Sequence, residues 1–162
     1  MVLNLFTAFH VVLSLLGIGS GFVLLYGWVT ARSFERWTTF FLTTTVATTV
    51  TGFMFPFHKF LPSYAVGILS LFVLAIALAA RYMFHLAGGW RRTYVVTATI
   101  ALYLNFFVLI AQLFQKVPLL KTWAPTQSAP AFLIAQTAAL ILFVCAGVLA
   151  AIKFPAAPLQ RT

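Results

Sequence analysis

The chain has 162 residues, of which 63% are hydrophobic and 17% aromatic, whereas only 7% are charged. An average soluble domain carries about 25% charged residues, and its surface needs polar side chains to face water. The composition therefore excludes a soluble globular domain and a disordered chain, and it predicts an all-α protein embedded mostly in lipid.

The charge is strongly unbalanced, with ten Lys and Arg residues against a single acid, Glu35, and a net charge of +9. The basic residues stand singly between apolar runs, so we expect them to orient the chain in the bilayer rather than to bind nucleic acid. One acid is too few for a two-carboxylate hydrolase or a carboxylate-bound Mg²⁺ or Ca²⁺ site. The chain is therefore not expected to act as an enzyme on its own.

A transmembrane helix needs about 20 mainly apolar residues. Pro62 and Pro130 stand where helices are expected to begin, a position that tolerates the missing N–H. The second stretch is unusual, because eight of its fourteen positions from 38 to 51 are Thr. The sequence predicts one polytopic transmembrane domain over residues 1–162, with five spans at about 3–28, 37–57, 63–86, 93–116 and 131–153.

The orientation follows from the basic residues at the ends of the predicted spans. Three of them are expected on one side: Lys59, Lys116 and Lys121. The other side is expected to hold seven: Arg32, Arg36, Arg81, Arg91, Arg92, Lys153 and Arg161. Because cytoplasmic loops carry the excess of Lys and Arg, the N-terminus is predicted outside and the C-terminus inside. The alanine-rich, basic character favours a bacterial cytoplasmic (inner) membrane.

Polar residues within the spans are the best candidates for a site, because placing them in lipid costs free energy. From the helical rise, His10, Gln112 and Gln136 are expected about 6–10 Å below the outer surface on three different helices. Asn105 lies deeper on nearly the same face as Gln112, and Tyr103 lies at a similar height. We expect this ring to bind a quinone-like or other small amphipathic head, or else to form a purely structural hydrogen-bond network.

Haem b is an alternative, because two histidines on different helices can ligate the iron from both faces. His10 and His58 are both expected in the outer half, although His58 would lie about 10 Å shallower. A purely structural role for these residues, or solvation of His58 at the interface, is the simpler interpretation.

A basic cluster is expected at the inner surface, where Arg81 and His85 would share a helical face and Arg91 and Arg92 follow. It would interact with anionic lipid or with an acidic partner, or simply extend its side chains to the membrane surface. Glu35 is expected to form an ion pair within its own loop, which also contains Arg32 and Arg36.

Two small-residue patterns indicate close helix contacts. Gly17 and Gly21 form a small-xxx-small pair that is typical of helix packing, either within the chain or in self-association. The Thr-rich stripe and Asn105 would suit a small transporter or channel; the stripe comprises Thr44, Thr45, Thr48, Thr49, Thr51 and Gly52. The leading hypothesis is a non-catalytic, ligand-binding subunit of a membrane redox or transport assembly, and a purely structural subunit is the remaining alternative.

Overall fold

The computed structural model describes residues 2–55 and 62–154, and these residues form an all-α bundle. Six α-helices lie in the described part of the chain, and a π-helical segment, η1, continues α3. The elements are α1 (Val2–Val29), α2 (Glu35–Gly52), α3 (Pro62–Leu78), η1 (Ala79–Met83), α4 (Trp90–Lys116), α5 (Pro118–Trp123) and α6 (Pro130–Lys153). The predicted all-α class is confirmed, and α3 and α6 begin at Pro62 and Pro130 as expected.

Four helices within the described residues are long and apolar enough to cross a membrane, and they indicate an integral membrane protein. These candidate spans are Asn4–Val29, Tyr64–Met83, Trp90–Lys116 and Pro130–Lys153. The predicted second span is also a helix, α2, but it has 18 residues and is rich in Thr. It is therefore too polar to qualify on the same grounds.

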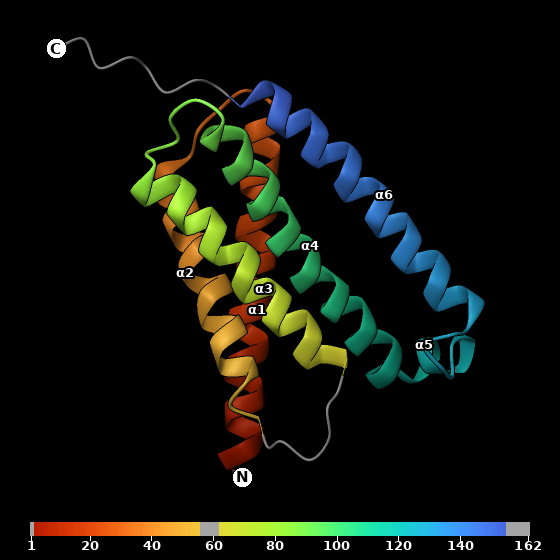
Figure 1. The fold of residues 1–162 in the computed structure, drawn as a ribbon. Helices are drawn as coiled ribbons and strands as arrows, with labels where there is room; N and C mark the ends of the chain where they lie inside the picture. Colours follow the sequence, from red (N-terminus) through yellow and green to blue (C-terminus); the bar gives the residue numbers. More distant parts are fainter. Residues whose placement is uncertain (1, 56–61, 155–162) are drawn as a thin grey trace, which may run out of the picture.

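The long helices run alternately up and down, so that α1, α3 and α6 begin at the end of the bundle where α2 and α4 finish (Figure 1). We call this end the N-terminal end, and the opposite end, where α6 finishes, the C-terminal end. Helix α2 packs mainly on α1, α3 on α4, and α6 on both α4 and α1. Helices α1 and α4 therefore separate α6 from the pair α2 and α3.

Most of the tightly packed core lies toward the C-terminal end. The side chains of Trp28, Tyr94 and Phe154 are each at most 5% exposed and contact one another at ring-centroid distances of 5.6–6.3 Å. Near mid-bundle, Gly21 lets α1 approach Leu102 and Phe41, which are 1% and 0% exposed. Gly17 and Gly21 of α1 thus make close contacts within the chain, as the packing interpretation of the glycine pair expects, and self-association through them stays a prediction.

The third helix ends earlier than predicted, and this changes the inner cluster. Its last turn is π-helical, which adds a residue per turn, and it finishes at Met83 rather than near residue 86. His85 and Leu86 follow in left-handed conformations, with φ of 48° and 57°. His85 therefore lies beyond the helix and does not share a helical face with Arg81, contrary to expectation. The short helix α5 was also unexpected, because the sequence predicts a loop there.

Candidate ligand-binding cavity

A cavity of about 590 Å³ lies among α1, α2, α3 and α4, toward the N-terminal end of the bundle. Its volume is within the range of about 300–1,000 Å³ that is usual for small-molecule sites. Most of its walls are apolar, and they include Leu15, Val66 and Leu104. Polar groups from all four helices interrupt these walls, and they include three residues predicted from the sequence: His10, Asn105 and Gln112.

His10 is fixed against α2 on one side of this cavity. Its Nδ1 lies 2.8 Å from Oγ1 of Thr51, and its ring meets Phe55 edge to face with a centroid distance of 5.2 Å. The position of a Cβ atom at Gly52 would be 3.6 Å from Cε1 of the ring, so the absence of a larger side chain there admits the imidazole. These contacts hold the ring in one orientation at the cavity wall.

Asn105 joins α4 to α1 farther from the N-terminal end. The Ser14 hydroxyl donates to Oδ1 of Asn105 at 2.8 Å, whereas Nδ2 of Asn105 makes only a long contact, 3.5 Å, with the Ser14 carbonyl oxygen. Gly17, one turn further along α1, leaves room for this amide and for α2 to approach. The carbonyl group of Asn105 is thus committed to helix packing, while its amide protons have spare donor capacity.

Thr45 differs from the other threonines of α2 that line the cavity. Thr48 and Thr49 each donate their hydroxyl to the helix carbonyl four residues earlier, at 2.8 Å. This bond is the usual way in which threonine satisfies its hydroxyl inside an apolar helix. Thr45 is 1% exposed, and its Oγ1 has no hydrogen-bond partner among the described residues. A buried hydroxyl in this state is an unmet donor that a bound oxygen atom would satisfy.

The remaining polar lining lies nearer the N-terminal end. Gln112 is half-buried one to two turns from Asn105, and the exposed Lys116 follows it on the same helix. Lys116 is the only charged side chain among the described residues that line the cavity, and no described acid reaches it. The lining thus favours a neutral or anionic polar head with an apolar tail, and it offers no counter-ion to a cationic ligand.

Two predicted members of the ring lie elsewhere. Gln136, on α6, is 7% exposed, and its Nε2 donates to the carbonyl oxygen of Phe107 at 3.1 Å. Tyr103 packs its ring against Phe143 of α6, at a centroid distance of 5.6 Å. Both residues therefore lie at the interface of α4 with α6 rather than in the cavity. Depth along the helices was the basis of their grouping, and depth says nothing about the direction in which a side chain points.

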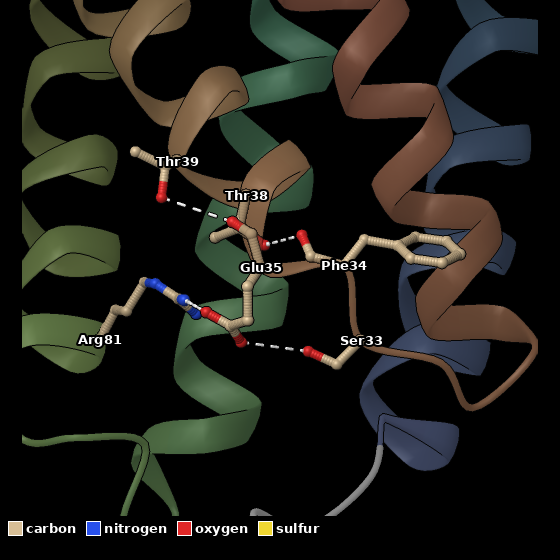
Figure 2. A network of polar contacts seen from close by, with 6 residues as sticks. All are labelled: Ser33, Phe34, Glu35, Thr38, Thr39 and Arg81. Atoms are coloured by element: carbon tan, nitrogen blue, oxygen red, sulfur yellow. Dashed lines mark hydrogen bonds and ion pairs between the residues drawn. The ribbon is translucent and has the colours of Figure 1, made fainter.

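A second polar cluster lies at the C-terminal end, where Glu35 at the start of α2 forms an ion pair with Arg81 of η1 (Figure 2). Ser33 also donates to the Glu35 carboxylate, at 3.3 Å. The Arg81 guanidinium lies 5.6 Å from the ring centroids of both Tyr82 and Tyr94. Glu35 is thus paired between helices, and not within its own loop as the sequence suggested.

The basic residues of that end differ in their exposure. The side chain of Arg81 is only 11% exposed, whereas His85 and Arg92 are exposed and Arg91 is half-buried. Arg81 is therefore enclosed by protein and does not extend its charge to the surface. The described residues show no group of three or more His, Cys, Asp and Glu that could hold a metal ion. His58 lies outside the described residues.

Comparison of the chain with protein-family models, with curated proteins and with solved structures finds no match in any of the three.

Proposed function

We propose that this protein is a non-catalytic integral membrane subunit that binds a small amphipathic molecule with a quinone-like head in the cavity among α1, α2, α3 and α4. The observation that carries the proposal is the unmet hydroxyl of Thr45 beside the spare amide donor of Asn105, within a cavity of suitable volume. A carbonyl or hydroxyl oxygen on a flat ring would satisfy both donors, and the apolar walls suit its tail. A redox or transport assembly is the setting we propose.

We further propose that α2 is a fifth span and that the cavity opens toward the outer side. Helix α2 packs along α1, and its residues Thr44, Thr48 and Thr51 donate their hydroxyls to carbonyl groups of the same helix, which lowers the cost of placing them in a bundle within lipid. Among the described basic residues, those at the N-terminal end are Lys116 and Lys121, and those at the C-terminal end are Arg32, Arg36, Arg81, Arg91, Arg92 and Lys153. This excess supports an inside C-terminal end.

The alternatives have weaker support. A channel along the Thr-rich stripe would need free hydroxyl groups, but Thr44, Thr48 and Thr51 donate theirs to carbonyl groups of their own helix. A bis-histidine haem would need His58 beside His10, and His58 lies outside the described residues. Binding of an amphipathic ligand is the function that uses the most features of the cavity.

The test is to identify what the purified protein carries. The protein is isolated in a mild detergent, and its bound molecules are extracted with organic solvent and identified by mass spectrometry. Val108 lines the cavity, whereas Val96 lies on the same helix, exposed and outside it. We expect wild type and Val96→Trp to retain a near-stoichiometric amphiphile and Val108→Trp to lose most of it. Bulk lipid alone in the wild type would contradict the proposal, and an absorbance band of haem would replace the proposed ligand with haem.

A further inference from the structure

The hydrogen bonds around His10 determine which of its ring nitrogens carries the proton. A threonine hydroxyl has one proton to donate, and that of Thr51 is directed to the carbonyl oxygen of Ala47, 2.7 Å away. Its Oγ1 therefore accepts at the contact with His10, so Nδ1 of His10 is the protonated nitrogen. In a neutral imidazole the other nitrogen, Nε2, then has a lone pair and acts as an acceptor.

This acceptor has no partner among the described residues, although it belongs to a ring that lines the cavity. The described lining contains no acid that would stabilise a charged imidazolium. A bound molecule that presents only acceptors, such as a quinone carbonyl, would therefore leave two lone pairs facing each other. A molecule that presents a hydroxyl group would instead donate to Nε2.

The two donors of the cavity, Thr45 and Asn105, lie farther along α1 than the acceptor Nε2 of His10. The position of a Cβ atom at Gly17 would be 3.2 Å from Oγ1 of Thr45 and 3.4 Å from Nδ2 of Asn105, so both donors lie beside Gly17 of α1. Asn105 also reaches the Ser14 carbonyl. Ser14 and Gly17 follow His10 by four and seven residues, which places the donors about 6–10 Å beyond His10 along α1. A six-membered ring with oxygens on opposite sides spans such a gap when each oxygen is about 2.8 Å from its partner.

We infer that the cavity prefers the reduced head, a para-dihydroxy aromatic ring, over the oxidised quinone. One hydroxyl donates to Nε2 of His10, and the opposite oxygen accepts from Thr45 and Asn105. This inference rests on the proposed function and adds the hydrogen-bonding state of the ligand. It assigns to His10 the recognition of a donor rather than the ligation of a metal.

The test compares three ligands that share a decyl tail and a ring and differ in their oxygens. They are a benzoquinone, its hydroquinone kept reduced under anaerobic conditions, and the dimethyl ether of the hydroquinone, which cannot donate. Binding to the purified full-length protein in detergent micelles is measured by equilibrium dialysis. One hydrogen bond corresponds to about a tenfold difference in affinity, so we expect the hydroquinone to bind about tenfold more tightly than the other two.

The variant His10→Phe keeps a ring beside Phe55 but removes the acceptor, and it should bind all three ligands with similar affinity. Equal binding of the three ligands to the wild-type protein would overturn the inference and leave the proposed function standing. No binding of any of them would overturn both. Because the ether is compared on the wild-type protein, the inference is tested even where His10→Phe does not fold.

Discussion

The two ends of the bundle differ in what surrounds their buried polar groups. At the C-terminal end, Arg81 is enclosed by two tyrosine rings and paired with Glu35. Its Nε and the Tyr94 hydroxyl also have no hydrogen-bond partner among the described residues, but they are buried in a closely packed aromatic core. At the N-terminal end, helices of the same chain surround a cavity, and the hydroxyl of Thr45, a residue that lines this cavity, has no hydrogen-bond partner among the described residues. A ligand can satisfy an unmet polar group beside a cavity but not one inside a closed core, so we interpret the N-terminal end as a binding half and the C-terminal end as a structural half.

The largest loss of stability is expected from a substitution of Gly21 in α1. In Gly21→Ala the new Cβ would lie 2.4 Å from Cδ1 of Leu102 and 2.9 Å from Cε2 of Phe41, two side chains without free space. Overpacking of this kind costs about 1–3 kcal/mol of unfolding free energy. The measurement is equilibrium unfolding in mixed micelles with increasing sodium dodecyl sulfate.

Two other glycines of α1 provide the matched comparison. A Cβ atom at Gly19 would have no heavy atom within 4 Å, so Gly19→Ala should change stability by less than about 0.5 kcal/mol. At Gly17 the nearest atom, Oγ1 of Thr45, would be 3.2 Å away, a contact that a shift of a few tenths of an ångström would relieve. Gly17→Ala should therefore cost clearly less than Gly21→Ala. Equal losses at Gly17 and Gly21 would show that the cavity half is packed as tightly as the core.

The second test separates charge from packing in the Arg81 cluster. The side chain of Glu35 is 71% exposed, so Glu35→Gln should lower the unfolding free energy by at most about 1 kcal/mol. Arg81→Ala also removes the contacts with Tyr82 and Tyr94, and should cost about 1–2 kcal/mol. The same unfolding assay applies. If Glu35→Gln were as damaging as Arg81→Ala, the ion pair rather than the enclosure by the tyrosine rings would hold this end together.

The sequence predicts the helices well because runs of apolar residues, prolines and charged breaks are local features. It also places His10, Asn105 and Gln112 in the correct half of the bundle, because position along a helix follows from residue number. It groups Gln136 and Tyr103 with them wrongly, because the rotation of each helix about its axis depends on packing between helices. The unexpected π turn at Ala79–Met83 shows the same limit, since one extra residue in a turn moved His85 off the face of Arg81.

Thr45 illustrates what sequence reasoning missed. It lies in a run of threonines, and nothing in that run distinguishes it from Thr44 or Thr48. Only the described hydrogen bonds show that its neighbours donate to their own helix while its own hydroxyl does not. The strongest single pointer to the proposed site is thus a property of the folded chain.

A further stability test concerns this residue, and its expected change has the opposite sign. Thr45→Val replaces an unmet hydroxyl with a methyl group of similar size, so the ligand-free protein should be unchanged or more stable by up to about 1 kcal/mol. Thr48→Val is the control, because Thr48 lines the same cavity but already donates to the Thr44 carbonyl at 2.8 Å. It should bring no gain in stability.

Ligand affinity should fall in Thr45→Val, although stability should not. If Thr45 donates to a bound oxygen, Thr45→Val should weaken hydroquinone binding about tenfold in the same dialysis experiment, whereas Thr48→Val should leave it nearly unchanged. A loss of stability in Thr45→Val would mean that its hydroxyl is bonded in the folded protein and marks no site. Gained stability together with lost binding would instead show that the cavity half gives up stability for recognition.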